Sequence, residues 1–347
     1  MKPYFLLIII TIIGSSCTTQ KQAAFPTKYL GHAEVLISNE MTSNPTEIGA
    51  TERYIILLNS KASPLIEIYD LKTGQRVAHF IHAGNGPHEA LSVTHLQIDA
   101  NQDDFSLCDI LKNQLLGGRI SEAIQDSLYM PKILYKGKAD QSANYDAMKK
   151  TSNFIVASSK TGEGRLRILD TLSGTDRCFI DYPAPSNIDK RLTPDQNASL
   201  YTSFLQTNHE GNRIGLSTLL GEMIDIVSLD NGEAKPIFTY HAAYPTNIEL
   251  IPVDDKVVAV ATKNTVIYFP RATATNQYLY VLYSGKTMQE KNAFSGNEVY
   301  VVDWNGKNTF KISLDQEVKA IAVSPDDKTL YGISSNMDVL KFNLTTM

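Results

Sequence analysis

Ile66-Glu67-Ile68-Tyr69-Asp70-Leu71-Lys72-Thr73-Gly74 contains the pattern from which the architecture of this chain can be worked out. Its first half is apolar and rich in Ile and Tyr, which favours a strand. The Asp, Thr and Gly that follow favour a tight turn. Related stretches occur at Leu166–Gly174, Ile224–Gly232 and Val299–Gly306. The chain therefore repeats a unit in which an apolar strand ends at a polar turn and a further strand follows.

The spacing of these copies indicates the size of the repeat. Copies separated by roughly 40–60 residues fit the four-stranded blades of a β-propeller, in which a blade buries its faces only against its neighbours. Six units can be placed, and the length of the fifth leaves a seventh blade open. The units span residues 45–83, 93–137, 145–183, 199–241, 250–314 and 317–345.

The last unit is one strand short, which suggests how the ring closes. It offers strands only at Val318–Val323, Thr329–Ile333 and Val339–Asn343, whereas Tyr29–Ser38 belongs to no unit. An unpaired first strand can complete the last blade and thereby remove the exposed sheet edges. We therefore predict one all-β domain over residues 28–347, a six-bladed β-propeller closed by an N-terminal strand in the last blade.

The first residues carry an export signal. Lys2 precedes the apolar run Tyr4–Ile13, and Gly14-Ser15-Ser16-Cys17 follows it. A positive start, a short apolar run and small residues are typical of a secretory signal, and the run is too short to span a bilayer. A Cys directly after small residues resembles a bacterial lipobox, which implies cleavage before Cys17 and acylation (palmitate) of that residue; an ordinary signal cut nearby is the alternative.

This interpretation divides the N-terminus into a lipoprotein signal peptide at residues 1–16 and a polar tether at residues 17–27. It predicts a protein of the cell envelope on the outer membrane. The chain between the lipid and the domain lacks the acidic cluster that often marks surface-exported lipoproteins, so we expect it to face the periplasm. The only contact with the membrane would then be the lipid on Cys17.

Composition excludes several classes of protein. With 43% hydrophobic and 20% charged residues the chain is an ordinary globular protein. It has 32 Lys+Arg against 37 Asp+Glu and no basic run, so nucleic-acid binding has no electrostatic basis. Cys108 and Cys178 could form a disulfide in an oxidising compartment, but we favour two unpaired, buried side chains.

Two motifs connect the chain to a known family. Ala322–Tyr331, with Ser324, Pro325 and Asp326 at its turn, resembles the S-P-D-G-K turn of TolB-like propellers, although Asp327 stands where Gly is usual. Ala83–Ala90 resembles the G-x-G-P-x-E box of six-bladed propeller lipoproteins from Gram-negative bacteria. The resemblance implies a TolB-like six-bladed propeller, and it makes Gly84, Gly86 and Pro87 structural residues of the box.

The same box supplies the candidate binding residues. It connects the first unit to the strand Val93–Ile98, and such links run over the face of a propeller where the central channel opens. Polar groups that could contact a ligand or partner there are Asn85, His88, Glu89 and His95. The alternative is a glycine turn in which Glu89 only accepts backbone N–H bonds.

No catalytic or metal-binding motif is recognisable. His79 and His82 have opposite parity on a strand and so face opposite sides. His88-Glu89 lacks the second His of H-E-x-x-H. The pairs Asp103-Asp104, Asp254-Asp255 and Asp326-Asp327 adjoin turn residues, so we expect them in exposed hairpin loops. We predict neither a metal nor a cofactor.

These observations favour a non-enzymatic, membrane-tethered binding module. By analogy with TolB, its partner would be an envelope protein, and a small molecule is the other option. A propeller enzyme with a metal in its channel, such as a gluconolactonase-like hydrolase or a lyase, is the alternative function. That enzyme would need inward-facing ligands from several blades to converge on one point.

Overall fold

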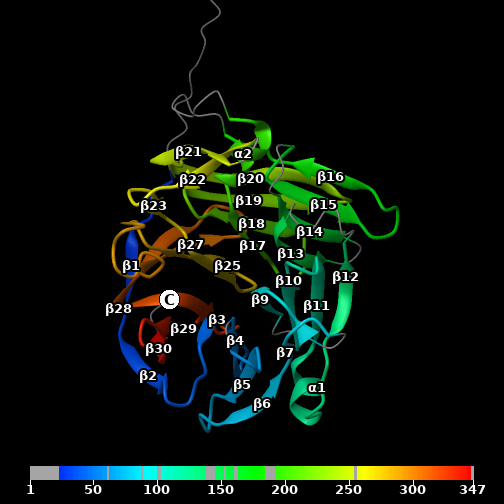
Figure 1. Ribbon diagram of the computed structural model, residues 1–347. Coiled ribbons are helices and arrows are strands. Elements are labelled where there is room, and N and C mark those ends of the chain that lie inside the picture. The colour runs from blue at the N-terminus through cyan, green and yellow to red at the C-terminus, as the bar shows by residue number, and fades with distance from the viewer. Residues whose placement is uncertain are drawn as a thin grey trace, which may run out of the picture.

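The computed structural model describes residues 23–60, 62–86, 89–99, 103–137, 145–151, 154–159, 163–183, 192–253 and 256–344. In this part of the chain strands dominate, and the only helices are the short α1 (Ile120–Gln125) and α2 (Pro194–Ser199). Figure 1 shows the strands arranged in successive blades, with the red C-terminal strands beside the blue N-terminal ones. The predicted signal peptide and Cys17 lie outside the described residues.

The first four blades are antiparallel sheets formed by consecutive strands. Each begins at the strand nearest the channel and proceeds outward. The strands are β3 (Pro45–Ala50), β4 (Tyr54–Asn59), β5 (Ile66–Asp70) and β6 (Arg76–Phe80); β9 (Val93–Asp99), β10 (Asp104–Asp109), β11 (Gln114–Arg119) and β12 (Lys132–Lys136); β13 (Tyr145–Thr151), β14 (Phe154–Ser159), β15 (Leu166–Asp170) and β16 (Asp176–Phe179); β17 (Ser203–Thr207), β18 (Arg213–Thr218), β19 (Glu222–Asp230) and β20 (Glu233–Ala243).

The last two blades share one long strand, β28 (Thr309–Val323). Its first half is the outer strand of blade five, and its second half is the inner strand of blade six. Blade five also contains β24 (Arg271–Ala274), β25 (Tyr278–Tyr283) and β27 (Gly296–Asp303), and blade six contains β29 (Thr329–Ser334), β30 (Val339–Asn343) and β2 (Ala33–Ile37). The described residues thus form six blades, each with four antiparallel strands, which confirms the predicted six-bladed propeller.

The unusual length of the fifth unit comes from strands added outside the blade. A hairpin of β21 (Ile248–Val253) and β22 (Lys256–Ala261) precedes it. A short ladder of β23 (Val266–Ile267) and β26 (Lys286–Thr287) lies beside it. These pairs do not belong to the four-stranded sheet of blade five, so the extra residues do not make a seventh blade.

The N-terminal strand closes the ring as predicted. β2 pairs antiparallel with β30, and Ala33 is opposite Phe342 while Val35 is opposite Leu340. The inner strands β3, β9, β13, β17, β24 and β28 contact one another in this order, and β28 contacts β3. The circle is therefore continuous, and its first blade packs against a blade that combines the N-terminal strand β2 with the C-terminal strands β29 and β30.

The predicted strand Tyr29–Ser38 is in fact divided. β1 (Thr27–Gly31) runs parallel to the first half of β28, with Tyr29 opposite Ile312, and so adds a strand to blade five. The chain then crosses to blade six, where the backbone N–H of Ala33 donates to Asp315 Oδ1 at 3.0 Å. Asp315 lies between the two halves of β28, so it fixes the point at which the N-terminal segment changes blades.

The part of the predicted tether that the structure describes is packed against the propeller. Phe25 lies 4.9 Å from the ring of Tyr240 and 4.8 Å from that of Tyr300, measured between centroids. The carbonyl of Pro26 accepts a bond from Lys311 N at 2.9 Å. The N-terminal segment is thus held to the outer edges of blades four and five from Ala23 onward.

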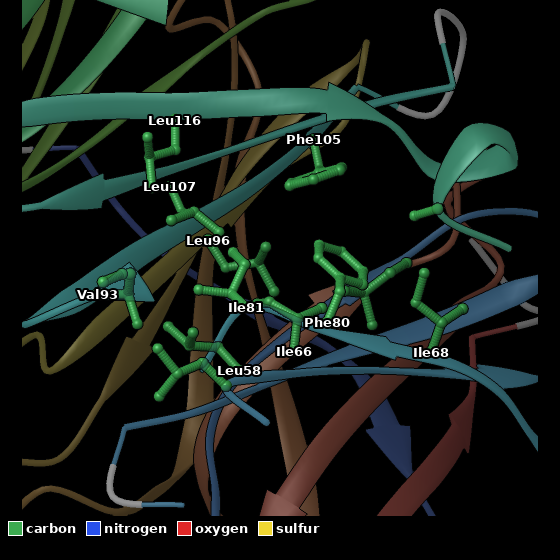
Figure 2. Close-up of a cluster of buried hydrophobic side chains, with 14 of the residues drawn as sticks. Leu58, Ile66, Ile68, Phe80, Ile81, Val93, Leu96, Phe105, Leu107 and Leu116 are labelled. Atoms are coloured by element: carbon green, nitrogen blue, oxygen red, sulfur yellow. The ribbon is translucent and has the colours of Figure 1, made fainter. Parts of the chain in front are cut away.

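The core lies mainly between neighbouring blades. Figure 2 shows one such cluster, in which Ile66, Ile68 and Phe80 of blade one face Phe105 and Leu107 of blade two. A polar link joins blades three and four: Arg165, only 2% exposed, donates to Asp225 Oδ2 at 2.6 Å. Although burial acts to raise the pKa of Asp225, the nearby Arg165 and His241 hold it below its usual value.

The repeated aspartate of the sequence motif has a structural cause. The Asp70 and Asp170 carboxylates each accept the backbone N–H groups two and three residues further on, which closes the turn after the third strand of the blade. Asp303 closes the corresponding turn of blade five in a related way. In blade four the turn is formed instead by Asn231 and Gly232, both with positive φ.

Ring closure by β2 can be tested with two alanine substitutions on the same strand. Ile37 is 2% exposed, so Ile37→Ala should lower the free energy of unfolding by about 2–4 kcal/mol. Val35 is 62% exposed, and Val35→Ala should change it by less than about 0.5 kcal/mol. Urea denaturation of both variants measures the difference, and equal effects would show that β2 does not seal the last blade.

Candidate functional site

The ends of the inner strands form one mouth of the central channel. A cavity there is lined by residues from all six blades. Beside it lies a larger cavity of about 550 Å³ formed by blades two, three and four. The two cavities share Gln97, Asp99, Lys149, Thr207 and His209. We call these five residues the channel site.

The charged groups of the channel site differ in whether they have a hydrogen-bond partner. His209 Nδ1 lies 3.0 Å from Asp99 Oδ1. No described residue hydrogen-bonds to Lys149 Nζ, and burial lowers the pKa of Lys149 although Asp99 acts in the opposite direction. Burial also raises the pKa of Asp104, which lines the same cavity. The site can therefore offer an ammonium donor next to a carboxylate and hydroxyl groups.

The channel is narrowed between its two mouths. Gln97 Nε2 donates to the carbonyl of Leu205 at 3.1 Å, which connects blade two to blade four across the ring. Gln206 Nε2 donates to the carbonyl of Ala272 of blade five at 3.0 Å. These bonds tie inner strands of different blades together beside the channel site.

The Gly84–Glu89 box lies before the start of β9, at the opposite mouth from the channel site. The Gly86 N–H donates to Glu89 Oε2 at 2.7 Å, and Lys112 Nζ donates to the carbonyls of Gly86 and Glu89 at 3.1 and 2.5 Å. β7 (His82–Ala83) pairs with β8 (Glu89–Ala90), and a Cβ on Gly84 would overlap the Glu89 carboxylate. The predicted glycine turn braced by Glu89 is thus present.

The binding role of the box residues remains a prediction. Asn85 and Glu89 are exposed, whereas Pro87 and His88 lie outside the described residues. The structure does not bring Asn85, Glu89 or His95 into the channel site, because the channel site is formed at the other ends of the strands.

His95 belongs to a distortion of the inner strand of blade two. Its φ is +58°, and its N–H donates to Glu47 Oε1 at 3.0 Å. The same carboxylate accepts bonds from the Thr94 hydroxyl at 3.0 Å and from Leu96 N at 2.7 Å. The His95 ring lies 5.7 Å from the ring of Phe204 in blade four. Glu47 therefore joins blade one to blade two and fixes where His95 stands.

The turn at Ser324, Pro325 and Asp326 forms as the motif predicts, but the next residue, Asp327, does not lie where we expect it. The Ser324 hydroxyl donates to Asp326 Oδ1 and accepts from Thr329 N, and Pro325 lines the channel mouth. Asp327 has the left-handed φ of +59° that suits the Gly usual there. This conformation directs its carboxylate inward.

Asp327 is consequently buried, and the prediction that it lies in an exposed loop is wrong. It is 6% exposed and accepts hydrogen bonds from the Thr275 hydroxyl at 2.6 Å and the Tyr280 hydroxyl at 2.8 Å. Burial raises the pKa of its carboxyl group. Asp327 thus links blade six to blade five, which a turn motif read from sequence does not reveal.

Cys108 and Cys178 are not bonded to each other, as favoured, but only Cys108 is buried as predicted, whereas Cys178 is half-buried. Cys108 is fully buried, and burial raises the pKa of its thiol to about 12. Across the described residues, no group of three or more His, Cys, Asp or Glu is placed to hold a metal ion. Nor is any helix in these residues long and apolar enough to cross a membrane.

The sequence did not point to the channel site. Asp99, Lys149 and His209 come from three blades and are separated by many residues, and none belongs to a motif. The one available signal is Lys149-Lys150 within an otherwise half-buried strand, because a charge there needs a polar surrounding.

Comparisons with known proteins agree with the fold. A family described as TolB-like 6-blade propeller-like matches residues 24–326. An exported protein of Bacteroides fragilis is similar in structure, with 13% identity, a TM-score of 0.52 and coverage of 90% of this chain and 98% of the other. A DUF4221 family member from Bacteroides vulgatus has 12% identity, a TM-score of 0.54 and coverage of 93% and 98%. No curated protein matches the sequence significantly.

The bracing role of Glu89 can be measured directly. Glu89→Ala removes the acceptor of the Gly86 N–H and should lower the free energy of unfolding by about 1 kcal/mol. Glu89→Gln should cost clearly less, because an amide oxygen still accepts that bond. Urea denaturation distinguishes the two, with Asn85→Ala as the exposed neighbouring control. Equal losses in both Glu89 variants would contradict the bracing role.

Proposed function

Because the chain belongs to the TolB-like six-bladed propeller family, we propose that it is an exported, non-enzymatic binding module that takes a small polar ligand at its channel site. The observation that carries this proposal is the cavity of about 550 Å³ at the ends of the inner strands. A cavity of that size is in the range of small-molecule sites. Blades two, three and four all supply lining residues, so the cavity is built on a rigid part of the fold.

The charges around the channel site indicate the kind of ligand. Lys149 and Lys150 are balanced by Asp99, Asp104 and Glu210 around the same cavity. A strongly charged ligand of either sign would meet like charges there, so the lining favours a neutral or zwitterionic molecule. Lys149 Nζ is the donor best placed to bind its oxygen atoms. An envelope-protein partner, expected from the resemblance to TolB, remains a separate prediction.

Ligand binding can be followed by thermal melting in a panel of monosaccharides and amino acids. We expect a saturable rise in melting temperature for the wild type and at least about tenfold weaker binding for Lys149→Met, which loses a charged hydrogen-bond donor. Lys132→Met, on an exposed outer strand, is the matched control. A panel without any saturable shift, or an unchanged affinity in Lys149→Met, would contradict the proposal.

We also propose that the protein is held to the membrane by a lipid on Cys17, facing the periplasm from the outer membrane. Five residues lie between Cys17 and Ala23, where the packed segment begins, and the six residue-to-residue steps of an extended chain reach at most about 20 Å. Acyl chains on Cys17 would therefore keep the outer edges of blades four and five near the bilayer, and the propeller could not move far from it.

Fractionation of cells that express Cys17→Ala tests this anchor. The wild type should be recovered with membranes and incorporate a palmitate analogue, whereas the variant should lose both properties. Ser16→Ala keeps a small residue before the cysteine and should behave like the wild type. A wild type that takes up no label, or a variant that stays with the membranes, would contradict lipid anchoring.

A further inference from the structure

The mouth of the channel opposite the channel site gathers positive charge. Arg271 is the first residue of β24, and Lys319 lies near the start of the second half of β28. The Arg271 guanidinium carbon lies 5.4 Å from the ring centroid of Phe204 on β17, and the His95 ring of β9 lies 5.7 Å from the same ring. We call His95, Phe204, Arg271 and Lys319 the cationic cluster; it draws on four blades.

The two basic side chains Arg271 and Lys319 have no carboxylate partner among the described residues. Arg271 uses one terminal nitrogen for the carbonyl of Pro270 at 2.8 Å, and its buried Nε has no hydrogen-bond partner. Lys319 Nζ contacts Met337 Sδ at 2.5 Å, and a thioether is a weak acceptor. Two donors with formal charge thus remain unsatisfied.

The carboxylates closest in the fold are engaged elsewhere. The Glu47 carboxylate of blade one already accepts three hydrogen bonds from β9 of blade two. Glu298 pairs with Lys311 at 3.0 Å and Glu317 with Lys286 at 2.6 Å. None of these three carboxylates is thus left to neutralise the cluster. Burial and the nearby Arg271 both disfavour the ammonium form of Lys319 and lower its pKa to about 8.

We propose that the cationic cluster binds a doubly charged oxyanion, such as a phosphate group, presented by a small ligand at this mouth of the channel. A guanidinium and an ammonium from adjacent blades can each donate to a different oxygen of one phosphate. Neutralising two unpaired cations requires two negative charges, which a phosphate group supplies and a single carboxylate does not. The ring of Phe204 forms an apolar wall beside Arg271.

This site is independent of the channel site. The Gln97–Leu205 hydrogen bond lies between them, and no residue of the cationic cluster lines the cavities at the other mouth. It lies at the end of the propeller where the inner strands begin, which is also the end that carries the Gly84–Glu89 box.

Thermal melting in increasing inorganic phosphate, with ionic strength held constant by NaCl, tests the proposal on the whole chain. The wild type should show a saturable rise in melting temperature, acetate should give a smaller one, and glycerol phosphate should show whether a phosphate ester fits as well as the free ion. Lys319→Met should weaken phosphate binding by about tenfold or more. Lys132→Met should bind like the wild type.

A second measurement separates binding from a structural role. Without phosphate, Lys319→Met should melt at a higher temperature than the wild type, because removing one of two neighbouring like charges relieves their repulsion. A lysine needed only for folding would lower the melting temperature instead. Arg271→Lys keeps the charge but loses the planar fork, and it should bind phosphate with intermediate affinity.

The proposal is wrong if the melting temperature of the wild type shows no saturable shift with phosphate, or if Lys319→Met keeps the wild-type affinity for phosphate. If Lys319→Met does not fold, Arg271→Lys decides in its place, and wild-type phosphate affinity in that variant also overturns the proposal.

Discussion

Closure of the ring is the constraint on which the rest of this structure depends. Blade six is completed by β2, which comes from the other end of the chain, and blades five and six share the single strand β28. If β2 were absent, the edge of β30 would expose unpaired backbone groups. Because the core of each blade packs mainly on its two neighbours, a gap at one point would leave two blades with an uncovered face.

Polar contacts between blades add a second constraint, because they fix where inner-strand residues stand. Glu47 binds the distorted part of β9, Asp327 reaches Thr275 and Tyr280, and Arg165 pairs with Asp225. A buried charge that loses its partner is costly, so these contacts favour one arrangement of neighbouring blades. This arrangement of the blades therefore determines where the side chains at both mouths of the channel lie.

The cations that we propose as ligand-binding groups lie on the inner strands. Lys149 at one mouth and Arg271 with Lys319 at the other are half-buried cations that lack carboxylate partners in the described part of the chain. By comparison, the buried carboxylate of Glu67 is hydrogen-bonded to both Asn59 and Arg76. The contrast between Glu67 and these three cations supports the proposal that ligands bind at the mouths of the channel.

The linear sequence specified the β class, the number of blades and the closure of the ring by an N-terminal strand, because apolar strands, turn residues and the missing strand of the last unit can be recognised along the chain. It placed the start of the fifth blade too early, because the hairpin β21–β22 precedes that blade, and it did not show that β1 and β2 join different blades. It also predicted the turn at Ser324–Asp326 and the acceptance of a backbone N–H by Glu89. It did not reveal that Asp327 turns inward, nor which lysines and arginines meet at the channel. Those features depend on contacts between strands that are far apart in sequence, and only the closed ring brings these strands together.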